Sequence, residues 1–206
     1  MFPCSHGKGA VAQADQFFNG LAMQLEKLEK GEPVEIFSDG TEDNQPGLRA
    51  GYYPGWENDI DLSVYEGEDL SNNIYSEEVP EWRKNSVGKS YGMVWVDVEI
   101  NPSTGCGWGT NYANNCNFLN DLVGRLQQHG LNVGIYASEY MWSTVMGSLG
   151  ACTSVAAKTS QYWYAHYDGV QSFSDYKKTG GWTKPAIKQF RGDVSACSIG
   201  IDQNFY

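Results

Sequence analysis

One segment constrains the fold of this chain more than any other, the nine residues 92–100 (GMVWVDVEI). Most of its positions are apolar or β-branched, which predicts a buried β-strand. Two carboxylates, Asp97 and Glu99, lie two residues apart in its last third. Because side chains alternate along a strand, both should lie on one face of the sheet, with their Cα atoms roughly 6–7 Å apart.

Two interpretations of this acidic pair are open. Burying two charges on one face of a strand is unfavourable unless other groups compensate them. In the first interpretation, the strand end opens into solvent and both carboxylates stay hydrated. In the second, the acids form a paired site at the carboxyl end of a parallel strand, where α/β proteins place their chemistry.

The acidity of the chain is concentrated in one segment. The net charge is −11 over 206 residues, which argues against nucleic acid as a partner. Residues 32–89 hold 14 of the 25 Asp and Glu residues against 4 Lys or Arg. Residues 32–90 are also rich in Gly, Pro and Asn, with scattered aromatic residues and one candidate short strand at 33–37. We interpret 32–90 as an acidic insertion or lid within a single domain spanning 1–206.

The cysteines favour disulfides over a metal site. The five are Cys4, Cys106, Cys116, Cys152 and Cys197. No two of them form a CxxC pair, which argues against a zinc site. We expect neither a metal nor a cofactor. Two disulfides with Cys4 left over would indicate an oxidising compartment, and five free thiols in a cytosolic protein are the alternative. The first residues lack the basic and apolar regions of a signal peptide.

Apolar periodicity and turn residues predict three helices and four further strands. The helices are expected at residues 10–30, 112–129 and 138–148, with Ser138 as an N-cap. The further strands are expected at residues 131–137, 161–167, 186–191 and 200–205. This order predicts an α/β fold with parallel pairing, in which the last three strands, with no helix between them, close the sheet by simple turns.

Five sequence segments, in order and with fitting spacing, are similar to the Ch-type lysozymes, glycoside hydrolase family 25. They are residues 95–99 (WVDVE), 134–138 (GIYAS), 162–167 (YWYAHY), 181–190 (GWTKPAIKQF) and 201–205 (IDQNF). The resemblance covers about 91–206, and 1–28 less strongly. It implies a modified TIM-type barrel of five β/α units followed by three strands.

This chain departs from the family pattern in two ways. Nothing before Met1 corresponds to the first two β/α units or to the essential Asp that the first strand carries, so we expect an incomplete barrel. Truncation is the favoured explanation, and an insertion that partly covers the opening is the alternative. The 32–90 insertion has no counterpart in the family pattern, and we expect it on the face opposite the active site.

The resemblance implies an enzyme that cleaves bacterial peptidoglycan between N-acetylmuramic acid and N-acetylglucosamine. Glu99 would be the general acid that protonates the leaving oxygen, Asp97 would position and charge-stabilise the reacting sugar, and Asp202 would complete the acidic site. This assignment fits the chemistry, because glycoside cleavage needs a proton donor and a stabiliser of an oxocarbenium-like state. A neighbouring carboxylate and partial burial would raise the pKa of one acid and keep it protonated.

The same resemblance implies that Tyr136 and Trp163 shape the sugar site. Gln189 is interpreted either as a sugar contact or as an edge hydrogen bond, and His166 as a structural or subsite residue. We expect peptidoglycan as the partner, no nucleic acid, no membrane and a monomer, in an extracellular, lysosomal or phagosomal location. The alternatives are a carbohydrate-binding protein impaired in catalysis and a fragment without a function of its own.

Overall fold

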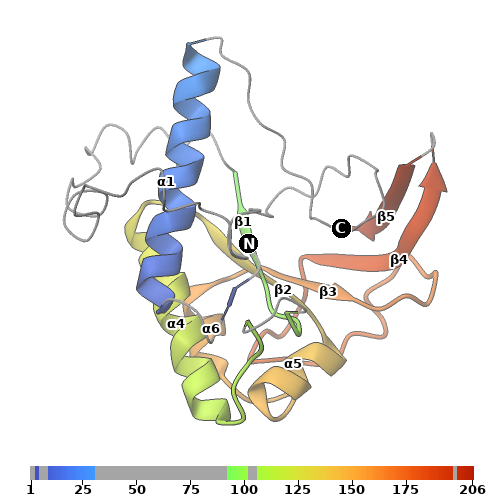
Figure 1. Ribbon diagram of the computed structural model, residues 1–206. Helices are drawn as coiled ribbons and strands as arrows, with labels where there is room; N and C mark the ends of the chain where they lie inside the picture. Colours follow the sequence, from blue (N-terminus) through green and yellow to red (C-terminus); the bar gives the residue numbers. More distant parts are fainter. Residues whose placement is uncertain (1–2, 5–8, 31–91, 102–105, 197–198) are drawn as a thin grey trace.

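The computed structural model describes residues 3–4, 9–30, 92–101, 106–196 and 199–206, and the expected insertion at 32–90 lies outside them. These residues form a mixed α/β fold around one five-stranded sheet (Figure 1). In chain order the elements are α1 (Ala10–Glu29), β1 (Val94–Asp97), α4 (Tyr112–Gln128), β2 (Val133–Ser138), α5 (Glu139–Met146), α6 (Thr153–Lys158), β3 (Tyr162–Ala165), β4 (Ile187–Ala196) and β5 (Ile199–Phe205).

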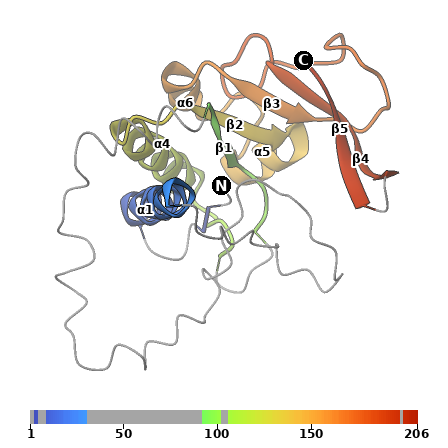
Figure 2. The ribbon, with the colours of Figure 1, turned by 90° about the horizontal axis from the view of Figure 1, so that it is seen from above.

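The five strands lie in the sheet in the order of the chain, β1-β2-β3-β4-β5. Pairs β1–β2, β2–β3 and β3–β4 are parallel, and β4–β5 is antiparallel. Figure 2 shows α1, α4 and α6 to one side of the sheet, and the curled sheet resembles half of a barrel. The α/β class with parallel pairing is confirmed, and the TIM-type assignment stays a prediction.

The core lies between the sheet and the helices. The helices contribute Phe18, Leu119, Leu122 and Trp142, and the strands contribute alternate residues such as Val96, Ile135, Tyr162 and Tyr164, all of them fully buried. Within the described residues, no helix is long and apolar enough to cross a bilayer. Burial of this apolar face is the main force that holds the helices on the sheet.

Helix α1 follows the expected bounds to within one residue. Its buried side packs on α4, where the Phe18 ring stacks on the His129 imidazole with centroids 4.1 Å apart. Asp15 accepts hydrogen bonds from Arg125 and His129 at 2.5 and 2.6 Å. Burial alone would raise the pKa of Asp15, but the bonds from Arg125 and His129 outweigh it and lower this pKa.

The predicted cap of α5 is confirmed, because the Ser138 side chain accepts a hydrogen bond from Met141 N at 3.1 Å. The helix ends at Gly147, whose φ of 91° lies in the left-handed region that favours glycine. Sequence periodicity missed α6, which spans Thr153–Lys158 and lacks a side-chain cap. Six residues are too few to show a helical period.

The expectation that Cys4 would be left without a partner is wrong. Disulfides join Cys4 to Cys106 and Cys116 to Cys152, and Cys197 lies outside the described residues. Cys4 and Cys106 are 102 residues apart, so only the fold brings them together. In the same region, Asn101 Nδ2 donates to the Pro3 carbonyl at 3.2 Å.

The prediction of simple turns holds only for the last strand pair. Strands β3 and β4 are parallel, so the chain must return across the sheet, and residues 166–186 do this without a helix. Strands β4 and β5 form an antiparallel hairpin whose register shifts between Gln189 and Arg191 and between Arg191 and Val194. Such irregularities bend a strand and re-aim its side chains.

Candidate active site

The two carboxylates of the first strand lie on the sheet face opposite the helices. Val94, Val96 and Val98 are buried, whereas Asp97 and Glu99 are half-buried, as the expected alternation requires. Strand β1 ends at Asp97, so Glu99 follows in the segment that leaves the sheet. Trp108 Nε1 donates to the Glu99 carbonyl at 2.7 Å and ties this segment down.

The register of the parallel strands places three expected site residues side by side. Asp97 pairs with Tyr136, and Tyr136 pairs with Trp163 on the next strand. The Tyr136 and Trp163 rings meet edge to face with centroids 4.9 Å apart. Trp163 Nε1 donates to Asn204 Oδ1 of β5 at 2.9 Å, which extends this arrangement to the last strand.

Gln189 is the central acceptor of this face. The side chain of this buried residue, through Oε1, accepts hydrogen bonds from the Tyr136 hydroxyl at 2.5 Å and from the Tyr167 hydroxyl at 3.2 Å. The backbone carbonyl of Gln189 accepts from His166 N at 3.0 Å. Gln189 therefore holds both phenols in place, and its contact with a sugar stays a prediction.

Burial and negative charges both raise the pKa of these two phenols. Burial raises the pKa of Tyr136, and the charges of Glu99 and Asp97 raise it further. Burial also raises the pKa of Tyr167, and here Asp202 and Glu99 are among the charges that add to the effect. The charge of Glu99 thus acts on both phenols.

The bulge in the hairpin fixes Asp202. Asp193 N donates to Asp202 Oδ1 at 3.0 Å, and Asp193 has a φ of 54°. Next to it, an added Cβ on Gly192 would lie 3.2 Å from Tyr167 Cζ and 3.5 Å from Asp202 Oδ1. The bare glycine therefore lets the tyrosine ring and the carboxylate approach the same stretch of backbone.

Sequence reasoning missed Tyr167, Asn204 and the role of Asp193. The sequence does indicate that Tyr167 lies on the face of Trp163, because it follows Trp163 by four residues and side chains alternate along a strand. The same rule places Asn204 with Asp202. Asp193 has the positive φ of a turn residue, and its backbone contact with Asp202 depends on the bulge.

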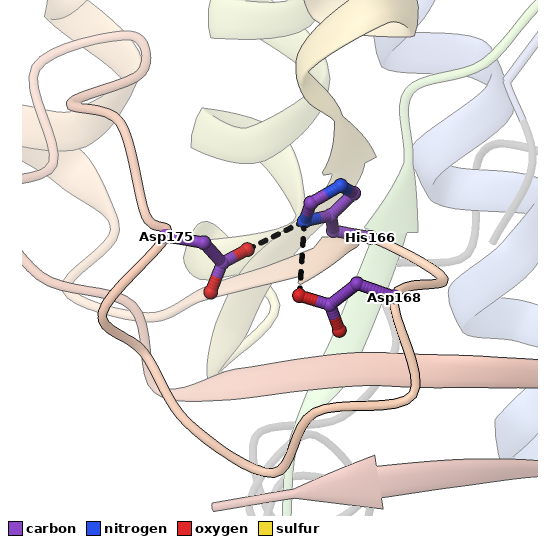
Figure 3. Close-up of side chains that lie close together, drawn as sticks. All are labelled: His166, Asp168 and Asp175. Carbon is purple, nitrogen blue, oxygen red and sulfur yellow. Dashed lines mark hydrogen bonds and ion pairs between the residues drawn. The ribbon is translucent and has the colours of Figure 1, made fainter.

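A second charged cluster lies at the ends of β3 and β4 (Figure 3). His166 Nδ1, Asp168 and Asp175 offer three possible metal ligands within 4.8 Å of one another. Lys188, which is fully buried, places its Nζ 2.8 Å from oxygens of both aspartates. The ammonium thus already supplies the cation for these carboxylates, and the cluster does not fit a metal site.

Comparisons with known proteins agree with the resemblance. A family model described as "Lysozyme-like protein 1" matches residues 74–190. "Probable GH family 25 lysozyme 4" of Dictyostelium discoideum is 38% identical over 117 residues, covering 57% of this chain and 50% of that protein. "Counting factor 45-1" of the same organism is 40% identical over 121 residues, covering 58% and 37%.

A nematode protein is also similar to this chain. "Lysozyme-like protein 7" of Caenorhabditis elegans is 34% identical over 118 residues, covering 55% of this chain and 40% of that protein. The chain thus spans half or less of the length of these relatives. No solved structure matches it. The family model covers more than half of the chain and agrees with the relatives, so the chain belongs to the lysozyme-like proteins of glycoside hydrolase family 25.

Proposed function

We propose that the chain is a glycoside hydrolase of the lysozyme type. Its substrate would be bacterial peptidoglycan, cut at the β-1,4 bond between N-acetylmuramic acid and N-acetylglucosamine. The observation that supports this most strongly is the sheet register, which places Asp97 beside Tyr136 and Trp163 at the carboxyl end of β1, with Glu99 two residues further on. Membership in a family whose relatives are named lysozymes supports it independently.

In this proposal, Glu99 is the general acid. It lies just past the end of β1, half-buried, with Asp97 two residues before it. The neighbouring negative charge and partial burial both favour the protonated form of one of the two acids. The proton of Glu99 would pass to the glycosidic oxygen as the bond to the anomeric carbon breaks, and Asp97 would stabilise the positive charge that develops on the sugar ring.

Asp202 and the aromatic residues would hold the sugar. Asp202 keeps one oxygen on the Asp193 amide, so its carboxylate has a fixed place beside the site. Trp163 and Tyr136 present half-buried rings on the same face. An apolar wall with a few fixed polar groups is the usual form of a small-molecule site.

Product analysis tests the bond that is cut. Purified cell walls are digested with the protein, the new reducing ends are reduced with borohydride, and the resulting sugar alcohols are identified. The proposal predicts muramitol. Glucosaminitol as the main product would contradict the assigned bond, and the absence of any new reducing end would contradict hydrolysis.

Carbohydrate binding without turnover is the second candidate. It is favoured by relatives named counting factors, "Counting factor 45-1" and "Counting factor 50", which match as closely as those named lysozymes. The half-buried rings of Trp163 and Tyr136 would support sugar binding with or without catalysis. Calorimetry with peptidoglycan fragments separates the two candidates, because binding without release of reducing ends supports this one.

The two disulfides support an oxidising compartment. We infer an extracellular or lysosomal location, which is where a protein that acts on bacterial walls meets its substrate. Maturation in such a compartment predicts that the described cysteines are inaccessible to a thiol reagent until the protein is reduced.

A further inference from the structure

Tyr167 is a residue of this site that the resemblance did not assign. It is 61% exposed, although its hydroxyl donates to the buried Gln189 side chain at 3.2 Å. An added Cβ on Gly192 would lie 3.4 Å from this hydroxyl and 3.5 Å from Asp202 Oδ1, so the hydroxyl and the carboxylate approach the same point of the backbone. A ring that is open to solvent, with its polar end held beside a carboxylate, can offer a bound sugar an apolar face and a hydrogen-bonding group together.

The backbone around Tyr167 continues the pairing of β3 with β4. His166 N donates to the Gln189 carbonyl at 3.0 Å, and Gly169 N donates to the Phe190 carbonyl at 3.0 Å. The alternation of β3 therefore carries on past its end, and Tyr167 lies on the face of Trp163. Its neighbours His166 and Asp168 lie on the other face.

On that other face, both neighbours of Tyr167 belong to the charged cluster of Lys188, Asp168, Asp175 and His166, of which Figure 3 shows the histidine and the two aspartates. Lys188 Nζ lies 2.8 Å from Asp168 Oδ2 and 2.8 Å from Asp175 Oδ1. His166 Nδ1 lies 2.6 Å from Asp175 Oδ2. Asp168 is thus bound directly to the Lys188 ammonium, and His166 is bound to it through Asp175.

We propose that Tyr167 contacts the bound sugar and that this charged cluster positions it from the opposite face of the sheet. The inference rests on the proposed function, because it names a further substrate contact of the same site. Lys188, Asp168, Asp175 and His166 are positioning residues in this account, since they act on the sugar only through Tyr167.

Two substitutions test the contact itself. Tyr167→Phe removes only the hydroxyl, and we expect kcat/KM on solubilised peptidoglycan to fall about 5- to 20-fold, the effect of one lost hydrogen bond. Gly192→Ala should displace the Tyr167 ring, because the added Cβ would lie 3.2 Å from Tyr167 Cζ. We expect kcat/KM to fall by about the same factor. Gly200→Ala is the matched control on the same hairpin, because its Cβ would meet no atom within 4 Å, and it should leave kcat/KM unchanged.

A double-mutant cycle tests the positioning role. Lys188→Met should lower kcat/KM, and the loss should largely disappear in the background of Tyr167→Ala, since the cluster then has no ring to position. A merely structural role of the cluster would give losses that multiply in the double variant. If Lys188→Met does not give a cooperative thermal transition, Asp168→Asn replaces it in the same cycle.

The outcomes separate this inference from the function on which it rests. If the wild-type protein releases reducing ends and Tyr167→Phe, Tyr167→Ala and Gly192→Ala all stay within two-fold of it, the contact is wrong and the hydrolase assignment stands. If the Tyr167 variants are impaired and the cycle is multiplicative, the positioning role is wrong. If the wild-type protein neither cleaves peptidoglycan nor binds tri-N-acetylchitotriose by calorimetry, both the function and the inference are wrong.

Discussion

Removing the buried ammonium of Lys188 should destabilise the protein strongly at neutral pH. Lys188 is fully buried, and its Nζ lies 2.8 Å from oxygens of Asp168 and Asp175. Breaking a fully buried ion pair from one side costs about 3–5 kcal/mol. Both aspartate side chains keep about a quarter of their surface exposed, so water compensates part of the loss, and we expect about 2–3 kcal/mol for Lys188→Met.

The pH dependence of this loss has a defined sign. Burial alone would raise the pKa of Asp175, but hydrogen bonds from Lys188, His166 and Tyr164 outweigh it and hold that pKa well below its usual value. The Lys188 hydrogen bond also lowers the pKa of Asp168. A carboxyl with a depressed pKa adds stability above its unfolded-state pKa of about 3.9, and this is lost as pH falls through the folded-state pKa.

The assay is urea unfolding of wild type and Lys188→Met at pH 7 and at pH 3. The difference in free energy of unfolding should be large at pH 7 and smaller at pH 3, where both aspartates of the variant are protonated. Thermal midpoints at pH 7 should differ by about 5–10 °C. Lys177→Met is the control, because Lys177 makes one exposed ion pair with Glu139 at 2.9 Å, and no measurable change is expected.

Two results would refute this reasoning. The first is a Lys188→Met protein as stable as wild type at pH 7, which would mean that the carboxylates need no counter-charge. The second is an equal difference at pH 7 and pH 3, which would assign the loss to packing of the lysine stem.

Two further predictions concern the sheet and the disulfides. Gly134→Ala should lower stability by about 1–3 kcal/mol and change tryptophan fluorescence, because the added Cβ would lie 2.5 Å from Trp95 Cζ3; an unchanged melt and spectrum would contradict the close packing of β1 on β2. Replacing both Cys116 and Cys152 by Ser should lower the free energy of unfolding, measured in urea, by about 2–4 kcal/mol, because the bridge joins residues 36 positions apart and closes the loop between them. A stability equal to wild type would show that this bridge does not constrain the unfolded chain.

Local patterns predicted most of the fold. The apolar stripe of residues 10–30 gave α1 to within one residue, because a long helix repeats its period several times. Ser138 was identified as a cap because its side chain acts on its own neighbours. Alternation around Val96 placed Asp97 and Glu99 on one face before the fold was known.

Contacts between segments far apart in the chain could not be predicted from the sequence. The Cys4–Cys106 disulfide depends on two segments 102 residues apart, and nothing in their spacing indicates the pairing. The parallel pairing of β3 with β4 depends on residues 166–186 crossing back without a helix. The close approach of Tyr167 to the backbone at Gly192 depends on the bulge in the hairpin, which only the paired strands reveal.

The rate at which Glu99→Gln releases reducing ends from peptidoglycan tests the central claim most directly. Glutamine keeps the shape of Glu99 and removes the proton that the leaving oxygen needs, so a loss of about 10²- to 10⁴-fold relative to wild type is predicted. Binding of tri-N-acetylchitotriose should stay within two-fold, and Glu139→Gln, a control whose half-buried side chain pairs with Lys177, should keep full activity. A Glu99→Gln protein that retains more than a tenth of the wild-type rate would contradict the account.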